Sequence, residues 1–367
     1  MQGGADWWRL WETGTKADRW RDRGTLSTPE AAARPAGAWR GATFHHTFLR
    51  ATALLYELSR TVPQDPPGSI WQNLRRDIKR GWSATYHAHK TLPRIDDWQW
   101  PYWGENSHSI PVHVIVSEAN WQMAAWMLAS WFCASDLGWP IVIHDDGTLT
   151  ADATEKLRTL FGVNLIIITR AEADPAMDMQ LRAFPFCEEF RRTHRQALKV
   201  FDIAEFTGGA RCIVFEPEVL FFQKPVEIRA WADSENEACW FCEDAVENSI
   251  ITVAEARDEL GVKLWRRVDT GICLLWTAAI DLDFVDRALA QTSILKGQPD
   301  RIASTLLALC ASQHNVGGLL PKTYEVSAER TAANDVVARH YSGASRERFF
   351  AEGLKRLRDS VLAFGGH

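Results

Sequence analysis

The sequence predicts an α/β fold in which a mainly parallel sheet is covered by helices on both faces. From residue 111 onward, short β-branched runs alternate with helical patterns. These runs are almost continuously apolar, as is typical of strands buried on both faces. The chain has 367 residues, of which 46% are hydrophobic and 24% charged, so it can bury a substantial core without disulfide or metal crosslinks.

The predicted elements follow one another as strand, helix, strand, helix, strand. Thr150 is an N-cap candidate for the second helix, and Gly162 is expected to end it. The predicted strands cover residues 112–116, 141–144 and 163–168, and the predicted helices cover residues 121–134 and 151–161. Strands that alternate with helices in this way pair in parallel, which indicates a nucleotide-binding topology.

A second unit of the same kind comes next. A helix is expected over about residues 191–206, ending at a pair of glycines, and a strand over 212–215. Glu216-Pro217-Glu218 follows at the carboxyl end of that strand. Two carboxylates separated by one residue can converge on Mg²⁺ or Mn²⁺ and on the diphosphate that it carries, or they can form a charged turn. By the same reasoning, Asp145 and Asp146 follow the second strand and are candidates for the rim of a pocket.

The first 110 residues differ from the rest in composition. They carry a net charge of +4, whereas the remainder carries −10, and they hold 10 of the 18 tryptophans. We therefore expect a helical, Trp-rich, net-basic extension over residues 1–110 and one α/β domain over 111–367. Within the extension, Ile70, Leu74 and Ile78 share one helix face, which can pack on the main domain or rest on an anionic membrane. The ten early tryptophans can pack the extension, stack on a sugar or anchor an interface, whereas Trp121, Trp126, Trp131 and Trp139 are expected in the core.

Composition excludes some classes of function. A net charge of −6 and a pI near 6.0 do not suit a general nucleic-acid binder. The first ten residues lack the pattern of a signal peptide, and the most apolar stretch, residues 123–134, is too short to span a bilayer. Seven scattered cysteines indicate reduced thiols and a cytoplasmic location, and the Cys239-x-x-Cys242 pair lacks a second pair at zinc spacing.

Six motifs in order resemble those of GT-A-fold glycosyltransferases, particularly bacterial relatives of glycosyltransferase family 8. The likeness spans roughly residues 110–355. The motifs are HDDG at 144–147, ALKVFD at 197–202, IVFEPEVLFFQKP at 213–225, VDTGICLL at 268–275, DRIAS at 300–304 and HYSG at 340–343. The resemblance implies a GT-A-type, mixed and mainly parallel sheet, and transfer of a sugar from a nucleotide-diphospho-sugar to a saccharide, lipid or protein acceptor.

The resemblance also implies roles for individual residues. Glu216-Pro217-Glu218 stands where the family has D-x-D, and His340 matches a His that completes the metal site, so the implied ligands of Mn²⁺ or Mg²⁺ are Glu216, Glu218 and His340. Asp269-Thr270-Gly271 matches a motif that contacts the sugar or acceptor. The remaining implied site residues are Asp300 near the transferred sugar, Lys199 near the donor phosphates, and Asp145 and Asp146 at the donor.

The chain departs from the family pattern at the acidic motif and beside Asp300. Glu replaces Asp twice, Pro217 removes a backbone donor, and Arg301 stands where the family often has Gln. Three interpretations follow: retained metal binding with altered geometry, transfer without metal, or a catalytically silent module that binds sugar, nucleotide or protein. A nucleotidyltransferase is disfavoured because residues 117–120, SEAN, are not a glycine-rich loop. Peripheral membrane contact through the extension is a further expectation.

Overall fold

The computed structural model describes residues 76–99, 108–208, 210–314, 317–326 and 334–364. The chain divides into two compact units, Met1–Gly81 and Trp82–His367, and the central sheet belongs to the second. Most of the predicted 1–110 extension, including Ile70 and Leu74, lies outside the described residues. Its predicted roles therefore stay predictions.

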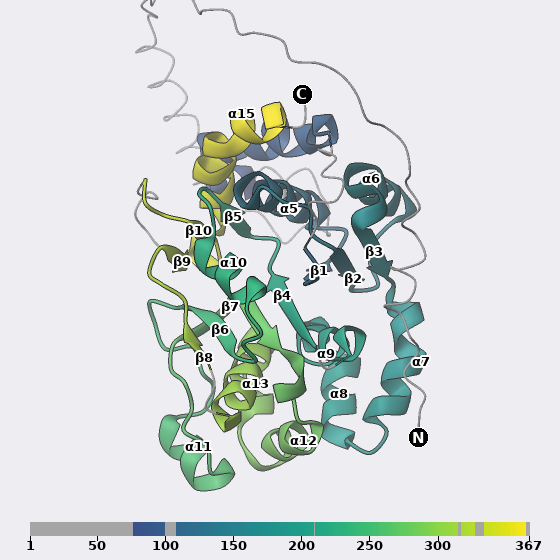
Figure 1. The fold of residues 1–367 in the computed structure, drawn as a ribbon, viewed down its shortest axis with the longest axis vertical. Helices are drawn as coiled ribbons and strands as arrows, with labels where there is room; N and C mark the ends of the chain where they lie inside the picture. Colours follow the sequence, from purple (N-terminus) through teal and green to yellow (C-terminus); the bar gives the residue numbers. More distant parts are fainter. Residues whose placement is uncertain (1–75, 100–107, 209, 315–316, 327–333, 365–367) are drawn as a thin grey trace, which may run out of the picture. The chain divides into compact units, whose positions relative to one another are not determined.

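A seven-stranded sheet forms the centre of this unit, in the order β3-β2-β1-β4-β7-β6-β8 (Figure 1). Its strands are β1 (Val112–Val116), β2 (Ile141–Asp145), β3 (Leu165–Ile168), β4 (Arg211–Phe215), β6 (Cys239–Glu243), β7 (Val268–Trp276) and β8 (Gly317–Leu319). β7 runs antiparallel to both of its neighbours, and the other strand pairs are parallel. The predicted mixed, mainly parallel sheet is confirmed.

Side chains alternate between two cores, as the pleat of a strand requires. Val112 and Val114 of β1, with Ile213 of β4, belong to one core, and Cys212 and Val214 of β4 belong to the other. Both cores are buried, so the strands are apolar on both faces. This is the physical basis of the continuous apolar runs in the sequence.

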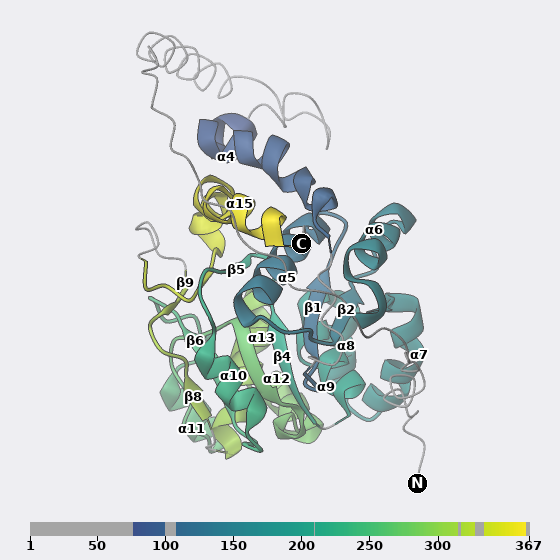
Figure 2. The ribbon, with the colours of Figure 1, turned by 45° about the horizontal axis from the view of Figure 1, so that its top comes forward.

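Helices cover both faces of the sheet (Figures 1 and 2). The helices that contribute to the first core are α4 (Trp82–Tyr86), α5 (Trp121–Ser135), α6 (Ala151–Phe161), α10 (Val226–Asp233) and α15 (Lys355–Phe364). Those that contribute to the second are α7 (Arg170–Leu181), α8 (Pro185–Thr193), α9 (Asp202–Thr207), α11 (Val253–Leu260), α12 (Leu282–Gln291) and α13 (Pro299–His314). The short helix α14 (Arg346–Arg348) follows the last strand.

A second, three-stranded sheet lies beside the first and has the order β5-β10-β9. Its strands are β5 (Val219–Phe221), β9 (Tyr324–Val326) and β10 (Ala338–His340). β10 runs antiparallel to β5 and parallel to β9. This small sheet ties a segment near the C-terminus to the segment that directly follows Glu218.

Local signals of the first βαβ units predict the structure well. The Thr150 hydroxyl accepts a hydrogen bond from the Ala153 amide at the start of α6, and Gly162 ends this helix with a φ of 57°. The prediction of a single helix over about residues 191–206 is wrong. α8 ends at Thr193, His194 is extended, and residues 195–199 form a 3-10 turn before α9 begins. The buried ion pair between Arg191 and Asp202 joins the two helices across this break.

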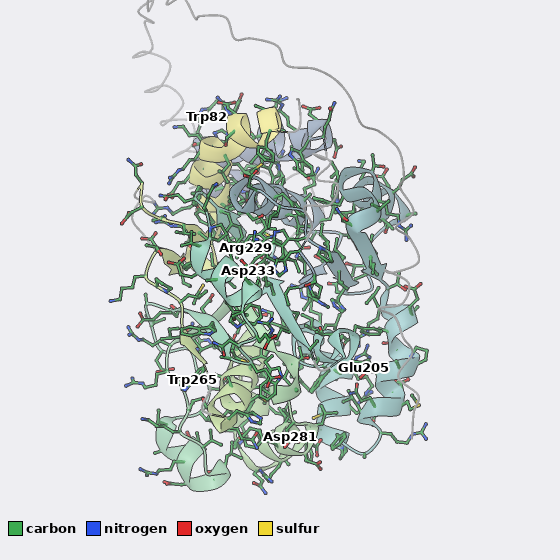
Figure 3. All side chains as sticks on the ribbon, viewed as in Figure 1. Trp82, Glu205, Arg229, Asp233, Trp265 and Asp281 are labelled. Carbon is green, nitrogen blue, oxygen red and sulfur yellow. The ribbon has the colours of Figure 1, made fainter. Side chains whose placement is uncertain are left out.

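The four tryptophans expected in the core are found there, and one tryptophan of the early group joins them. Trp126, Trp131 and Trp139 are fully buried and Trp121 is nearly so, which confirms their place in the core. Trp98 is also buried, 5.5 Å from the ring of Phe161. Trp82 of α4 is 63% exposed at the end of the unit where α15 lies (Figure 3).

All seven cysteines are free thiols, and Cys239 and Cys242 are both buried in β6. None of the helices that the structure describes combines the length and the apolar character needed to cross a membrane.

Candidate functional site

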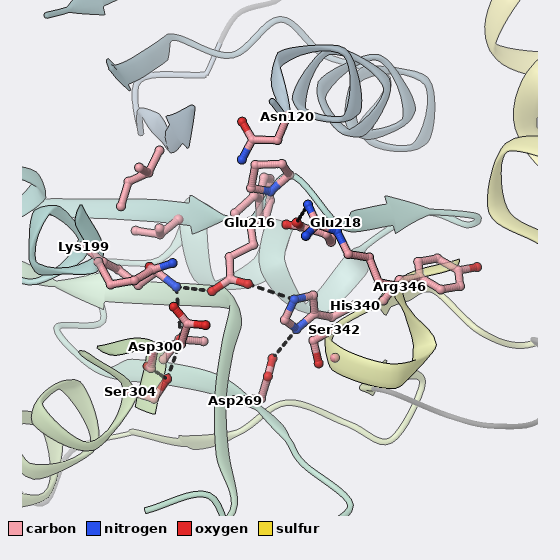
Figure 4. Close-up of a pocket in the computed structure, with 18 of the residues that line it drawn as sticks. Asn120, Lys199, Glu216, Glu218, Asp269, Asp300, Ser304, His340, Ser342 and Arg346 are labelled. Atoms are coloured by element: carbon pink, nitrogen blue, oxygen red, sulfur yellow. Dashed lines mark hydrogen bonds and ion pairs between the residues drawn. The ribbon is translucent and has the colours of Figure 1, made fainter. Parts of the chain in front are cut away.

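A cavity of about 510 Å³ opens where β1 and β4 end and β7 begins (Figure 4). This edge of the sheet is where ligands bind in doubly wound folds, because the strand order reverses there. The structure brings nine of the residues singled out in the sequence to the wall of this one cavity: Asp146, Lys199, Glu216, Glu218, Asp269, Thr270, Asp300, Arg301 and His340.

Two strand pairings assemble the acidic motif with the C-terminal histidine. Glu216 directly follows β4, and its amide donates to the carbonyl of Gly271 in β7. His340 is the last residue of β10 and pairs with Val219 of β5, and the Tyr341 amide donates to the carbonyl of Glu218. The backbone therefore holds Glu216, Glu218 and His340 around one space.

Lys199 and Glu216 form an ion pair within the site. The Lys199 side chain is buried, and its ammonium donates to Glu216 Oε1 and, at 3.2 Å, to the Thr270 hydroxyl. Burial by itself would lower the pKa of Lys199, but the charge of Glu216 raises it overall. Burial would likewise raise the pKa of Glu216, yet Lys199 and His340 hold it well below its usual value. Both groups are therefore charged at neutral pH.

His340 lies between two carboxylates and is almost fully buried. Its Nδ1 is 2.9 Å from Asp269 Oδ1, and its Nε2 is 2.9 Å from Glu216 Oε2 (Figure 4). Burial opposes protonation, but Asp269 and Glu216 together raise the pKa of His340 well above its ordinary value. The contact between Nε2 and Glu216 is an ion pair whose angles do not fit a hydrogen bond.

Gly271 makes the space that His340 occupies. A Cβ atom built on Gly271 would lie 2.3 Å from Nδ1 of His340, far inside van der Waals contact. Its amide also donates to Asp269 Oδ1 at 2.9 Å. The Asp269-Thr270-Gly271 motif thus has a packing reason for its glycine, in addition to the donor contact that the sequence predicts.

Replacing Gly271 with alanine is expected to displace the His340 ring and to break its bond with Asp269. Because the new methyl group has no free space in the core, we expect the free energy of unfolding to fall by about 1–3 kcal/mol. Urea denaturation measures this loss. Gly318→Ala is the matched control, since its Cβ would meet only the Trp240 ring, at 3.2 Å. An unchanged stability for Gly271→Ala would contradict this packing.

Glu218 is joined to a cation that the sequence analysis missed. Its Oε1 lies 2.8 Å from Nη2 of Arg346, the first residue of α14. Burial raises the pKa of Glu218, and Arg346 opposes this rise. Arg346 stands three residues beyond the matched HYSG motif. The sequence signal that could have identified Arg346 is its position as a basic residue shortly after this motif.

The predicted metal ligands are only partly assembled as a set. Glu216 and His340 meet, and the bond from His340 Nδ1 to Asp269 leaves Nε2 facing the acidic motif, as in sites where a carboxylate orients a ligating histidine. Glu218 is paired with Arg346. Among the residues that the structure describes, no group of three His, Cys, Asp or Glu is arranged to hold a metal ion. Two ligands fit, and the three-ligand site stays a prediction.

The two aspartates after β2 have different surroundings. Asp146 lines the cavity and lies 3.5 Å from Nη1 of Arg195. Asp145 is buried, and its Oδ1 accepts bonds from the amides of Gly147, Thr148 and Leu149. The structure therefore places Asp145 in the support of the loop and does not place it in the cavity wall.

Four further polar residues, to which the sequence analysis gave no role in the site, line the cavity. Ser304 of α13 lies 2.9 Å from the Thr270 hydroxyl, which links this helix to Lys199 through Thr270. Asp244 follows β6, and Asn248 contacts its Oδ2. Asn120 precedes α5 and accepts a hydrogen bond from the Ser117 amide. Single polar residues in loops carry no pattern that distinguishes them from solvated surface.

Comparison with solved structures gives likenesses to glycosyltransferases. Mouse xyloside xylosyltransferase 1 in its apo form is 12% identical and covers 64% of this chain and 97% of its own, with a TM-score of 0.42. The galactosyltransferase LgtC, in complex with donor and acceptor sugar analogues, is 12% identical over 70% of this chain and 96% of its own, with a TM-score of 0.45. The apo structure of the bifunctional glycosyltransferase WbbM is 8% identical and covers 88% of this chain and 66% of its own, with a TM-score of 0.46.

No family model matches the chain, and no curated protein matches it. Structural likeness at such low identity says nothing of substrate or activity.

Proposed function

We propose that this protein is a glycosyltransferase that moves a sugar from a nucleotide-diphospho-sugar to an acceptor. One observation carries the proposal. Inside a cavity at the carboxyl ends of β1 and β4, the cationic groups of Lys199, His340 and Arg346 surround Glu216 and Glu218. Such fixed cations are suited to bind a diphosphate and to stabilise the charge that develops on it as it leaves.

The reaction requires few groups from the protein. The bond between the anomeric carbon and the diphosphate oxygen breaks, and the electron pair leaves with the diphosphate. An acceptor hydroxyl oxygen bonds to the anomeric carbon and loses its proton, which the departing diphosphate accepts. Lys199 and Arg346 bind and orient the diphosphate, and Asp269 and Asp300 orient the sugar and support positive charge at its anomeric carbon.

A divalent cation, Mn²⁺ or Mg²⁺, belongs to this proposal. Glu216 and Glu218, together with His340 once it has lost its proton, would hold it, and it would supply further positive charge for the leaving diphosphate. The acceptor class, whether saccharide, lipid or protein, and the cytoplasmic location inferred from the thiols remain parts of the same proposal.

Calorimetry with UDP and GDP, each in Mn²⁺ and in EDTA, tests nucleotide binding. A second assay measures the release of free nucleotide from the sugar conjugates of UDP and GDP. Arg346→Gln is expected to weaken nucleotide binding about tenfold or more, because a charged hydrogen-bond donor is lost. Arg229→Gln is the matched control. Arg229 is similarly exposed, is paired with Asp233 on α10 (Figure 3), and does not line the cavity. If the wild-type protein neither binds a nucleotide nor releases one, the proposal is wrong.

A catalytically silent binding module is the second candidate, and the pairing of both glutamates with protein cations favours it. In that case, the triple variant Glu216→Asp, Pro217→Ser, Glu218→Asp should acquire metal-dependent nucleotide binding that the wild-type protein lacks. Metal-dependent binding by the wild-type protein that is lost in Glu218→Ala would exclude the silent module.

A further inference from the structure

Residues from both sides of the strand-order reversal line the cavity, and the strand order indicates which side receives which part of a donor. Asn120 and Asp146 line it beside β1 and β2, and Asp244 lines it beyond β6. Glu216, with Lys199, lies between these ends, after β4. In doubly wound sheets the nucleotide lies at the point where the strand order reverses, which here is between β1 and β4. A diphosphate at Lys199 therefore directs its sugar toward Asp244 and α13.

Arg301 belongs to this sugar end of the cavity. It lies in the first turn of α13, is exposed, and lines the cavity together with Asp300. The contact between Ser304, one turn later, and Thr270 holds this part of α13 against the site. The position of Arg301 is thus set by a helix that is anchored to the reaction centre.

The guanidinium of Arg301 differs from the other cations of the cavity. Lys199 is paired with Glu216, Arg346 with Glu218, and Arg195 with Asp146. No hydrogen bond or ion pair joins Arg301 to another of the residues that the structure describes. Asp300 does not neutralise it, because successive side chains on a helix point about 100° apart.

We propose that the donor is a nucleotide-activated uronic acid and that Arg301 binds the carboxylate of its sugar. This inference rests on the proposed function and names its substrate class. A guanidinium matches a carboxylate with two parallel, charge-assisted hydrogen bonds, and a neutral sugar offers no such charge. The carboxylates of Asp244 and Asp300 at the same end accept hydrogen bonds from sugar hydroxyls. A uronic acid needs both kinds of partner.

Calorimetry on the full chain with UDP, UDP-glucose and UDP-glucuronate tests this inference, with the guanosine series GDP, GDP-mannose and GDP-mannuronate run in parallel. The wild-type protein is expected to bind the uronate conjugate about tenfold or more tightly than the neutral one. Arg301→Gln, which keeps a hydrogen-bond donor and removes the charge, should abolish this preference. Its affinity for the free nucleoside diphosphate should stay within about twofold of the wild-type value.

Lys296→Gln is the matched control, because Lys296 is an exposed cation just before α13 and outside the cavity wall. It should keep the full preference. Equal binding of uronate and neutral conjugates by the wild-type protein overturns the inference. So does an Arg301→Gln variant that loses affinity for UDP or GDP alone, since Arg301 then binds the diphosphate. If no nucleotide binds at all, the proposed function fails as well, and this outcome is distinct from nucleotide binding without a preference for the uronate.

Discussion

Lys199→Met is expected to lower the free energy of unfolding by about 3 kcal/mol and to abolish nucleotide binding. The substitution preserves the length and apolar part of the side chain but removes a buried ammonium. Glu216, which is 25% exposed, then keeps its charge without its main partner. Removing one member of a buried ion pair costs far more than removing an exposed one, because the remaining charge is poorly solvated.

The double variant Lys199→Met, Glu216→Gln separates this cause from a simple packing defect. It removes both charges and should recover more than half of the stability that the single variant loses, as measured by urea denaturation. Lys156→Met is the control, since Lys156 forms a solvent-screened ion pair with Asp152 and its loss should leave the stability nearly unchanged. Equal losses in the single and double variants would show that the charge of Glu216 does not need Lys199.

Arg339→Met is expected to lower the free energy of unfolding by about 3–5 kcal/mol, enough to unfold a domain of marginal stability. Arg339 in β10 is fully buried. Its Nε donates to Glu325 of β9 at 2.9 Å, and its Nη1 donates to Glu352 at 2.8 Å. Without the guanidinium, two carboxylates remain beneath the small sheet that carries His340.

Chemical denaturation of Arg339→Met checks this expectation, and Arg348→Met is the control. Arg348 also pairs with Glu352, at 2.9 Å, but its side chain is 27% exposed, so its loss should cost about 1 kcal/mol or less. Arg339→Lys should recover only part of the stability, because an ammonium cannot bridge two carboxylates as the planar guanidinium does. If Arg339→Met is as stable as Arg348→Met, the buried network does not support β10.

The first half of the α/β domain was predictable because its signals are local. The three apolar strands, the cap at Thr150 and the stop at Gly162 each depend on a few consecutive residues. The split between α8 and α9 was not predictable in this way. The apolar pattern continues through it, and the interruption is stabilised by Arg191 and Asp202, which meet only once the two segments have packed.

For the site, the sequence itself was sufficient to place Glu216 and Glu218 at a strand end, and the family resemblance singled out His340, Asp269 and Lys199. Composition and motif order also determined the class of fold. What only the tertiary structure decided is which charges meet. His340 contacts Asp269 across 71 positions of sequence, and Arg346 reaches Glu218 through the pairing of β5 with β10. Strand pairing between distant segments and the low dielectric of a shared cavity set these partners and their charge states, and neither is encoded in any single stretch of the chain.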